Sequence, residues 1–522
     1  MSAEHAGDVA ELRSRGVVKL KGDDSYALWL KTACGQLSAR QLHKLADVAD
    51  AYGKGIILFT TRQIPMIPFV RLGDVPRAQT ELNREDVTLD RCGPTVRNVN
   101  VCYDDVTCPE ALANSLSLGE KLDHFFHVAM THKVKLGVAG CAKDCDMVRV
   151  LTDIGFIAAE SGGRVGYDVY VGGRLGLKSS IGQRVAEGLV EEQCVRLVQN
   201  YFHLMNTQGK KDERAADLMT RLGYLPVRQA LHLDLDSASG VAPIRCPARA
   251  APTESATSII RVRANSGEVT SAQLRRIADM AAEYGRGFVH FAVRGGPEIP
   301  GVRASDVGAA NTALQAAGLE PLGDGLANLQ SCFGGYCTEG NTDPQSLLRR
   351  VEALAREKGL DKQRVTVSGS GCPNACGIPA LSDIGFHGAV EPRVEAASCN
   401  GCGICVPVCK RRAIELRDGV AVLNADECRH CGVCITVCPF GGMVEGRRGF
   451  ALSVGGRGDG DTRLGRVIAN FLSEDEALQA AEVCLRVIQS HGTDAAAVID
   501  RHGIGVFKDA LAARAASQEH AR

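Results

Sequence analysis

Two stretches of the chain repeat the same order of apolar and polar positions. QLSARQLHKLADVADAYGKGIILFTTR, which ends at Arg62, has apolar residues at three- and four-residue spacing, then Gly, then a β-rich run. EVTSAQLRRIADMAAEYGRGFVHFAVR, which ends at Arg294, shows the same order later in the chain. Such spacing followed by a continuous apolar run predicts an amphipathic helix and then a strand. The chain is therefore predicted to contain an internal duplication.

Shorter motifs repeat at nearly the same offset as Arg62 and Arg294. GCAKDC, with Cys141 and Cys145, matches GCPNAC, with Cys372 and Cys376. TDIGF, which starts at Thr152, matches SDIGF, which starts at Ser382. Because the offsets agree, we interpret the two halves as copies of one unit. Each half alternates β-rich runs with helices, so we predict an α+β fold with pseudo-two-fold symmetry.

A later pair of motifs shows where the second half is longer. DVYVGGR contains Gly172 and its match ALSVGGR contains Gly455, so the offset is larger here than between TDIGF and SDIGF. The growth of about 53 residues indicates an insertion between about residues 390 and 445. We predict a self-contained module in a loop of the second repeat.

The composition of the chain indicates the cellular compartment in which we expect it and the kind of ligand that it binds. The 522 residues include 21 cysteines and 58 glycines, and the net charge of −1 gives no global attraction to nucleic acid or to an anionic membrane. MSAEHAGDVAELRSR at the N-terminus lacks the apolar stretch of a signal peptide. No segment approaches the roughly 20 apolar residues of a membrane span, so we expect a cytoplasmic protein. In that reducing compartment, clustered thiols indicate bound metal rather than disulfides.

Eight cysteines of the insertion follow the spacing of a bacterial two-cluster ferredoxin. Each run reads C-x2-C-x2-C-x3-C, and Pro439 follows the second run. In that spacing the fourth cysteine of each run ligates the cluster of the other run. Zinc knuckles, the alternative, use four ligands with longer separations. We therefore predict two [4Fe–4S] clusters, cluster one on Cys399, Cys402, Cys405 and Cys438, and cluster two on Cys428, Cys431, Cys434 and Cys409.

Each half also carries its own set of four cysteines, drawn from two distant loops. Four thiolates are enough for one more cubane in each set. The spacing leaves open whether the first set holds a cluster or is a relic. The first-half set is Cys102, Cys108, Cys141 and Cys145, and the second-half set is Cys332, Cys337, Cys372 and Cys376.

Both halves, both cysteine sets and the insertion together resemble the sulfite and nitrite reductase family. In this family a [4Fe–4S] cluster is coupled to sirohaem through a shared thiolate from the last cysteine of C-x3-C, which implies Cys376 here. An insertion at this position is similar to the dissimilatory and anaerobic sulfite reductases, whereas two halves fused in one chain are similar to the assimilatory enzymes. The gap of four residues between Cys332 and Cys337 departs from the usual five.

The resemblance also implies a set of basic residues from the first half. In fused members the second-half cysteines hold the cluster, and first-half bases face the sirohaem and the substrate. The matching positions are Arg62 in TTRQ, Arg97 and Asn98 in an RN motif, and Lys133 and Lys135 in THKVKLGV. The equivalent QRVTV of the second half has no Lys-x-Lys, which favours one working site. Such cations would offset the sirohaem carboxylates, hold an oxyanion on the iron and relay protons.

The reaction that the resemblance implies is the six-electron reduction of sulfite to sulfide by a sirohaem-dependent enzyme. In the family the second lysine of Lys-x-Lys tends to be retained for sulfite and replaced by asparagine for nitrite, so Lys135 favours sulfite. Three alternatives stay open: a nitrite reductase of the same fold, a cobalamin-pathway precorrin hydroxylase-like enzyme, and an electron-transfer subunit with a degenerate sirohaem site. No flavin or nicotinamide motif stands out, so we expect an external electron-donor protein. The oligomeric state stays open.

The expected cofactors are three or four [4Fe–4S] clusters and one or two sirohaems, according to whether the first-half set is filled. We divide the chain into a first ferredoxin-like half-domain at 10–92, a first sirohaem/[4Fe–4S] domain at 93–210, a linker at 211–256, a second ferredoxin-like half-domain at 257–310, a second sirohaem/[4Fe–4S] domain at 311–492 that is interrupted by a ferredoxin insert at 393–445, and a C-terminal helix and tail at 493–522.

Overall fold

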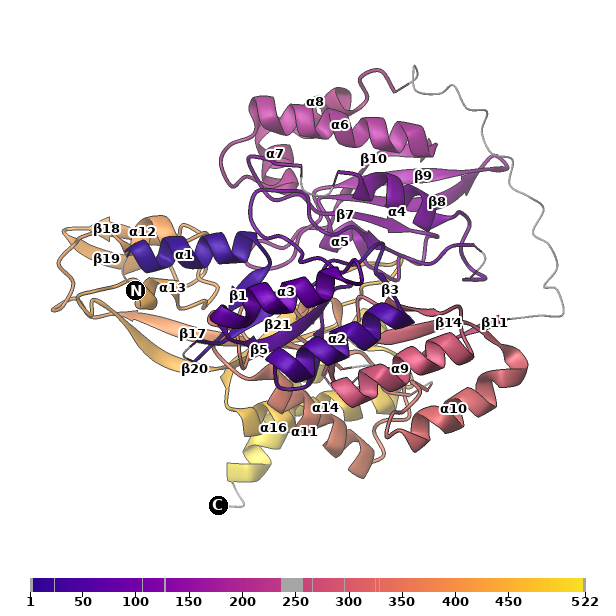
Figure 1. Ribbon diagram of the computed structural model, residues 1–522. Coiled ribbons are helices and arrows are strands. Elements are labelled where there is room, and N and C mark those ends of the chain that lie inside the picture. The colour runs from indigo at the N-terminus through magenta and orange to yellow at the C-terminus, as the bar shows by residue number, and fades with distance from the viewer. Residues whose placement is uncertain are drawn as a thin grey trace. The chain divides into compact units, whose positions relative to one another are not determined.

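The computed structural model divides the chain into two compact units, which are described separately below (Figure 1). The first unit comprises Met1–Arg174, Ser179–Leu322 and Gly458–Thr462, and the second comprises Leu175–Lys178, Gly323–Arg457 and Arg463–Arg522. The residues that the structure describes are 3–22, 24–105, 107–125, 128–235, 257–264, 266–294, 296–323, 325–327 and 329–519. Within them, no helix has both the length and the apolar content that a bilayer crossing requires.

Two half-domains of the first unit repeat one order of elements. The first consists of α1 (Ala3–Ser14), β1 (Val17–Lys19), β2 (Tyr26–Trp29), β3 (Gln36–Ser38), α2 (Ala39–Tyr52), β4 (Ile56–Phe59), β5 (Pro65–Val70) and α3 (Val75–Asn83). The second consists of β11 (Thr257–Arg261), β12 (Glu268–Thr270), α9 (Ser271–Glu283), β13 (Phe288–Phe291), β14 (Pro297–Arg303) and α10 (Val307–Ala316). The strand–helix–strand order at their centres is the one that the repeated apolar pattern predicts.

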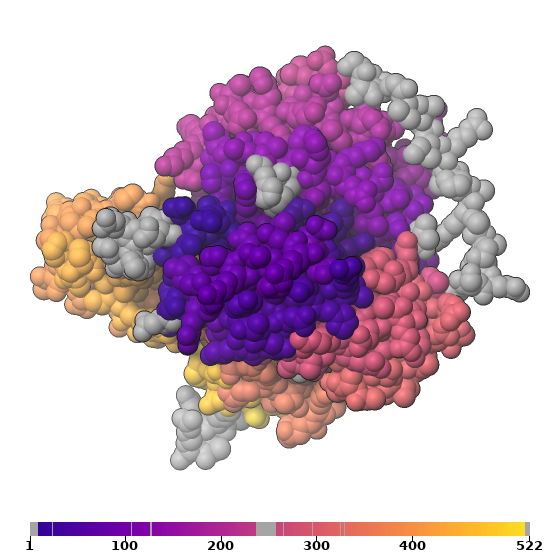
Figure 2. All heavy atoms as spheres, in the orientation of Figure 1, coloured from indigo at the N-terminus to yellow at the C-terminus, as the bar shows by residue number. Residues whose placement is uncertain are grey.

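The half-domains exchange one strand each. The sheets run β1-β2-β5-β4-β12 and β11-β14-β13-β3, so β12 completes the first half-domain's sheet and β3 completes the second's. Each exchanged strand leads into a capping box, Ser38 with Gln41 and Thr270 with Gln273, which starts α2 or α9. The two helices pack together over one shared hydrophobic core. In Figure 2 the indigo and salmon surfaces of the half-domains meet without a gap.

A mixed sheet and its helices complete the first unit. The sheet order is β10-β9-β8-β7-β6, with β6, β7 and β8 parallel and the remaining pairs antiparallel. A second hydrophobic core lies between this sheet and its helices. The elements are β6 (Asn100–Val101), α4 (Ser115–Asp123), β7 (Leu136–Ala139), α5 (Val148–Leu151), β8 (Ile154–Ser161), β9 (Arg164–Val171), β10 (Gln183–Leu189) and α6 (Glu191–Gln208).

The segment that we expected to be a linker, 211–256, is structured over its first part. It forms α7 (Ala215–Leu222) and α8 (Tyr224–Leu231), whose buried Leu218, Val227 and Leu231 belong to the core of the mixed sheet. The Ala-, Pro- and Ser-rich composition that suggested a connector lies in 236–256, outside the described residues. The first domain therefore extends to at least residue 235.

The second unit repeats this mixed sheet. Its order, β15-β16-β17-β20-β21, has the same two parallel and two antiparallel pairings as β6-β7-β8-β9-β10. This match confirms the predicted duplication. The elements are β15 (Gln330–Ser331), α11 (Pro344–Glu357), β16 (Val367–Ser370), β17 (Ile384–Val394), β20 (Met443–Val454), β21 (Arg466–Leu472), α14 (Glu474–His491), α15 (Ala495–His502) and α16 (Gly505–Glu519). The chain after α14 thus forms α15 and α16, where one helix and a tail were expected.

The insertion replaces the turn of one β-hairpin. In the first half, β8 and β9 pair up to Ser161 and Arg164, and Gly162 and Gly163 close the turn with positive φ. In the second half, the equivalent β17 and β20 pair as far as Val394 and Met443, and the chain between them forms the ferredoxin insert. The insert contains α12 (Cys405–Val408), β18 (Ile414–Arg417), β19 (Val420–Leu423) and α13 (Val433–Thr436). A hairpin tip accepts such a module because both ends of the insert leave adjacent strands.

The repeated Asp of TDIGF and SDIGF has one backbone role and two electrostatic environments. Asp153 accepts a hydrogen bond from the Lys135 amide at 2.8 Å, and Asp383 accepts one from the Thr366 amide at 2.9 Å. Burial would raise the pKa of Asp153, but the bidentate ion pair with Arg214, at 2.8 and 2.7 Å, holds it below its usual value. Burial raises the pKa of Asp383, and no arginine of the described residues forms an ion pair with it.

We predict that Asp153→Ala destabilises the first unit by about 3–5 kcal/mol, because it leaves the largely buried Arg214 cation unpaired. Trp29, the single tryptophan of the chain, lies in β2 of this unit and reports its denaturant unfolding by fluorescence. The double variant Asp153→Ala/Arg214→Met should recover part of the loss, since no lone cation stays buried. A loss below about 1 kcal/mol would mean that this pair behaves like an exposed one.

Candidate sirohaem and iron–sulfur site

Cluster one has its four predicted ligands grouped around one hollow of the ferredoxin insert. Cys399, Cys402, Cys405 and Cys438 all line this cavity, together with Ile404, Leu416 and Phe440. Burial raises the pKa of the Cys405 thiol, and the three neighbouring thiols raise it further. Cys438 therefore lies with the three cysteines of the first run, and the crossed ligation of cluster one stays a prediction.

The other four cysteines of the insert, which are the predicted ligands of cluster two, are also neighbours. Burial raises the pKa of Cys434 to about 12, and the thiols of Cys431, Cys428 and Cys409 raise it as well. Neutral thiols packed in this way resist ionisation, whereas iron stabilises the thiolate form that binds it. Cys409 thus joins the second run, as the ferredoxin spacing predicts.

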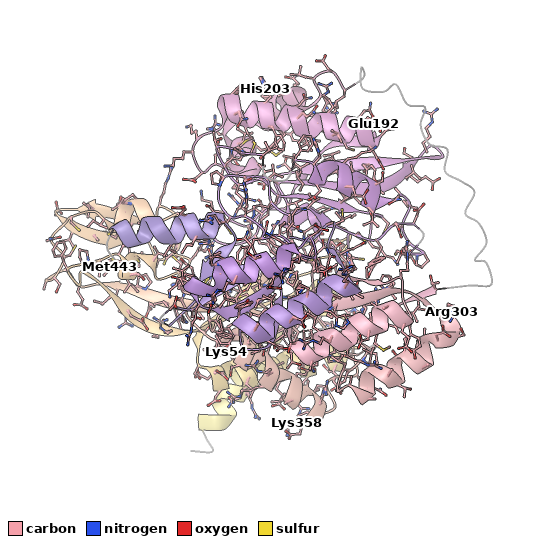
Figure 3. The ribbon with its side chains drawn as sticks, in the orientation of Figure 1. Lys54, Glu192, His203, Arg303, Lys358 and Met443 are labelled. Atoms are coloured by element: carbon pink, nitrogen blue, oxygen red, sulfur yellow. The ribbon has the colours of Figure 1, made fainter. Side chains whose placement is uncertain are left out.

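Backbone amides point at the sulfur atoms of the insert. The Ala421, Met443 and Ala413 amides donate to the Sγ atoms of Cys399, Cys438 and Cys409 at 3.4, 3.3 and 3.2 Å. Met443 is labelled in Figure 3, at the start of β20. A donor aimed at a sulfur atom favours the charged thiolate, so these three contacts fit loops that bind iron–sulfur clusters.

The second-half set is also brought together, from the loop after β15 and the loop after β16. Burial raises the pKa of Cys332 well above its usual value, and the thiols of Cys376, Cys372 and Cys337 add to this. The Gly371 amide donates to the Cys332 Sγ at 3.2 Å. Among the described residues, no three His, Cys, Asp or Glu side chains are close enough to bind one metal ion. A cubane instead spreads its four ligands over four iron atoms.

The first-half set forms the equivalent group in the first unit. Burial raises the pKa of Cys145 to about 12, and the nearby Asp146, Cys141 and Cys108 raise it further. Burial also raises the pKa of Cys102, and Asp146 and Cys145 add to this, so all four thiols are neighbours. This group has the four thiolate ligands that a cluster requires, as the second-half set does.

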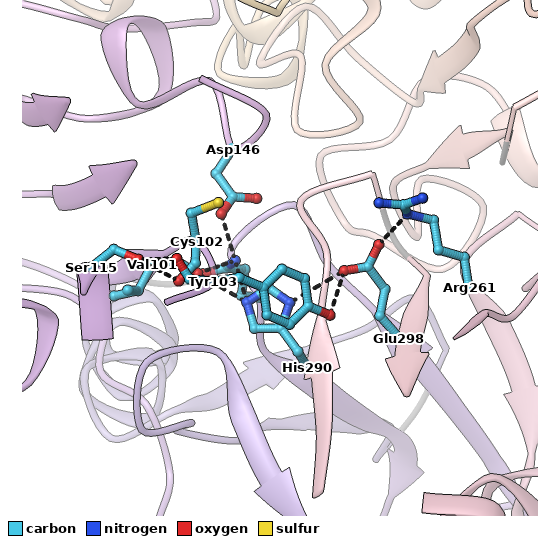
Figure 4. A network of polar contacts seen from close by, with 9 residues as sticks. Val101, Cys102, Tyr103, Ser115, Asp146, Arg261, His290 and Glu298 are labelled. Atoms are coloured by element: carbon cyan, nitrogen blue, oxygen red, sulfur yellow. Dashed lines mark hydrogen bonds and ion pairs between the residues drawn. The ribbon is translucent and has the colours of Figure 1, made fainter. Parts of the chain in front are cut away.

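A polar network adjoins the first-half set and was not expected from the sequence (Figure 4). Glu298 accepts hydrogen bonds from Tyr103 at 2.8 Å and from Arg261 at 2.8 Å. The buried His290 contacts both Glu298 and the Val101 carbonyl, and Gln63 bonds to Asp146. The network therefore ties β13 and β14 of the second half-domain to the loop that carries Cys102.

The basic residues predicted from the first half lie together in the first unit. Arg62 donates to the Asn98 carbonyl at 2.7 Å, and Arg97 forms a buried 2.6 Å ion pair with Asp90. The Asn98 side chain accepts from the Thr32 amide and donates to the Thr32 hydroxyl. Asn98 thus holds Arg62 through its backbone carbonyl and is itself bonded to Thr32, and its predicted contact with a cofactor stays a prediction.

Lys133 and Lys135 lie beside these arginines, just before β7. Burial lowers the pKa of Lys133 to about 8, and the positive charges of Arg214, Arg97 and Arg62 lower it further. Burial, with Arg62 and Lys133 as neighbours, lowers the pKa of Lys135 well below its usual value. Neither ammonium group has an ion pair within the described part of the chain. The group therefore carries more positive charge than its own carboxylates offset.

Arg214 is a fifth cation of this group that the sequence did not reveal. It lies at the start of α7, 61 residues from its partner Asp153, and no motif marks it. We call Arg62, Arg97, Lys133, Lys135 and Arg214 the cation group. Within the described residues, the buried Nε atoms of Arg62 and Arg97 have no hydrogen-bond partner. Unpaired donors and excess positive charge fit a polyanionic ligand such as a carboxylate-bearing tetrapyrrole.

Three family models match most of the chain. Residues 92–238 match the nitrite and sulphite reductase 4Fe-4S domain. Residues 18–85 and 252–317 match the nitrite/sulfite reductase ferredoxin-like half domain. Residues 398–442 match a 4Fe-4S dicluster domain. The two reductase models thus cover the cation group and the strand-exchanged half-domains, and the third covers both cluster-binding runs of the insert.

Known proteins resemble the chain over parts of its length. It is 34% identical over 260 residues to a coenzyme F420-dependent sulfite reductase of Methanocaldococcus jannaschii, which covers 48% of this chain and 42% of that protein. It is 32% identical over 241 residues to an anaerobic sulfite reductase component of Salmonella typhimurium, covering 42% of this chain and 70% of that protein. It is 25% identical over 403 residues to a chloroplastic ferredoxin–nitrite reductase of Oryza sativa, and the match covers 70% of this chain and 66% of that protein.

A solved structure shares the fold of the chain. The Mycobacterium tuberculosis NirA protein aligns with a TM-score of 0.73 and 17% identity, over 96% of this chain and 90% of that one. Three findings agree with one another: the domain matches, the shared fold, and the similarity to the Salmonella protein over more than two thirds of its length. The chain belongs to the nitrite and sulphite reductase family of oxidoreductases.

Proposed function

We propose that the chain is a sirohaem-dependent reductase of a small oxyanion, with sulfite as the first candidate substrate. The observation that carries this proposal is the cation group, which holds excess positive charge and unpaired donors in a protein that also has four sets of four cysteines. Relatives named as sulfite and as nitrite reductases support the class of reaction. Electrons reach the site from an external donor through the ferredoxin insert.

The second-half cysteines would hold the active-site cluster, and Cys376 would share its thiolate with the sirohaem iron. When bound, sirohaem supplies the iron centre at which the anion is reduced. The cation group would bind the carboxylates of the macrocycle and the substrate anion. Fixed positive charges stabilise charge on oxygen atoms as they leave, and they need no reorganisation during the reaction.

Lys133 and Lys135 are suited to supply protons to the departing oxygens. The pKa of Lys133, at about 8, lies close to neutral pH, where an ammonium group both holds and releases a proton readily. Burial and the neighbouring cations also lower the pKa of Lys135, which makes its ammonium group a more ready proton donor than an ordinary lysine. Arg62 and Arg97 stay charged at neutral pH and so would position the anion rather than exchange protons with it.

The choice between sulfite and nitrite rests on Lys135. An additional basic side chain at the anion site would favour the more highly charged anion, and the family resemblance associates this lysine with sulfite. Nitrite is the second candidate, because a relative that matches 70% of the chain is a nitrite reductase. Turnover of both anions by the same preparation separates the two.

We predict that Lys135→Asn lowers kcat/KM for sulfite by about 10²-fold, because it removes one preorganised charge from the anion site. The value for nitrite should fall less than about tenfold, so the preference moves toward nitrite. Lys358→Asn is the matched control, because Lys358 follows α11 at the surface, labelled in Figure 3, and pairs with Glu357. Equal losses on both anions would contradict a selective role for Lys135.

We predict that cluster iron falls by about four atoms in Cys434→Ala, while the sirohaem absorption bands remain. Cys376→Ala should lose the sirohaem bands as well as cluster iron, because it removes the shared ligand. Cys484→Ala is the control: this thiol is buried in α14, and burial alone raises its pKa to about 12. Iron, sulfide and extracted pigment are counted in each variant. Retention of sirohaem in Cys376→Ala would exclude the proposed coordination.

A further inference from the structure

A chain of hydrogen bonds links cluster two of the insert to the second-half cysteine set, entirely within the second unit. Asn341 lies between Cys337 and α11. Its side-chain amide donates to the carbonyl of Cys431, a ligand of cluster two, at 3.4 Å. Its backbone amide donates to the Gly371 carbonyl at 2.6 Å. One residue therefore contacts the loops of both iron–sulfur sites.

The hydrogen-bonded path continues from Asn341 to two predicted ligands of the active-site cluster. Gly371 precedes Cys372 directly, and its amide donates to the Cys332 Sγ at 3.2 Å. A Cβ on Gly371 would lie 2.6 Å from the Gly334 Cα, so the two ligand loops meet backbone to backbone. A path from Cys431 to either Cys332 or Cys372 thus crosses hydrogen and covalent bonds, with no van der Waals gap.

Arg448 on β20 fixes the position of Asn341. Its Nη1 donates to the Asn341 carbonyl at 3.1 Å, and its guanidinium also pairs with Glu445. A Cβ on Gly388 of β17 would lie 2.2 Å from the Gly371 carbonyl oxygen. The strands that carry the insert therefore pack against the same backbone that Asn341 binds. This packing holds Asn341 in one position between Cys431 and Gly371.

Cluster one lies at an exposed side of the insert. Its cavity is lined by Ile404, Leu416 and Phe440, which are 42%, 42% and 52% exposed. Cluster two instead borders β17, since the Val390 amide donates to the His430 carbonyl at 2.8 Å and Gly432 packs on Val390. The two clusters therefore differ in position: cluster one is distal to the second-half set and cluster two is proximal.

We propose that Asn341 is the positioning residue through which cluster two passes electrons to the active-site cluster, with cluster one upstream. The inference rests on the proposed function, which supplies the acceptor. In each step one electron leaves reduced cluster two and reduces the second-half cluster by one electron. No bond forms or breaks and no proton moves. Electronic coupling decays less steeply through bonds than through space, so loss of the Asn341 side-chain bond slows this transfer.

The test uses reduced holoenzyme mixed rapidly with sulfite, with reoxidation of the ferredoxin clusters and of the sirohaem followed separately. In Asn341→Leu the ferredoxin clusters should reoxidise on the order of tenfold more slowly, since the bridge is lost, while the first electrons leave the sirohaem centre at the wild-type rate. Asn341→Asp keeps the size of the side chain but removes the amide donor, so it should slow reoxidation of the ferredoxin clusters as Asn341→Leu does. Asn83→Leu, an exposed position at the end of α3, is the control.

Reduction potentials of all clusters, measured by EPR titration, should be unchanged in both Asn341 variants. Wild-type reoxidation rates in both would overturn the inference and leave the proposed reductase intact. A change in potentials that accounts for the slowing, or loss of iron from both variants, would also overturn it, because Asn341 would then tune or support a cluster. A wild-type protein without sirohaem or turnover would instead defeat the proposed function.

Discussion

Backbone pairing between β12 and β4, and between β3 and β13, is the constraint on which the first unit depends. Each half-domain completes its sheet with a strand from the other, so neither has a finished core alone. The exchange also reaches the cation group, because the Phe59 amide at the end of β4 donates to the Gly267 carbonyl at 2.7 Å. The turn that carries Arg62 and Gln63 follows at once, and it is held by backbone from the second half of the sequence.

The cation group buries five basic side chains, of which two form ion pairs with buried acids. Two acids, Asp90 and Asp153, pair with Arg97 and Arg214, whereas the pKa values of the two lysines are lowered instead. Such an arrangement costs stability in the free protein and is relieved by an anionic ligand. The energetic cost of the cation group and its proposed role in binding a macrocycle and an oxyanion therefore have the same origin.

The duplicated sheet places the cysteine sets of the two halves by a simple rule. Ligand loops follow β6 and β7 in one copy and β15 and β16 in the other, at the ends of parallel strands. The hairpin after them ends in a Gly-Gly turn in the first copy and in the ferredoxin insert in the second. Adjacent antiparallel strands hold both ends of the insert, so the cysteines of the proposed cluster two keep a fixed position next to the loop that carries Asn341.

The duplication, the place of the insertion and the grouping of the ferredoxin cysteines could be predicted from the order of residues alone, because period and ligand spacing are local properties of a chain. A family motif also indicated Arg62, Arg97, Lys133 and Lys135. The strand exchange, the pairing of Arg214 with Asp153, the hydrogen bonds between Asn98 and Thr32, the helices α7 and α8, and the contacts of Asn341 emerged only in three dimensions. These features join residues far apart in the chain, and such contacts leave no periodic or spacing signal from which they could be inferred.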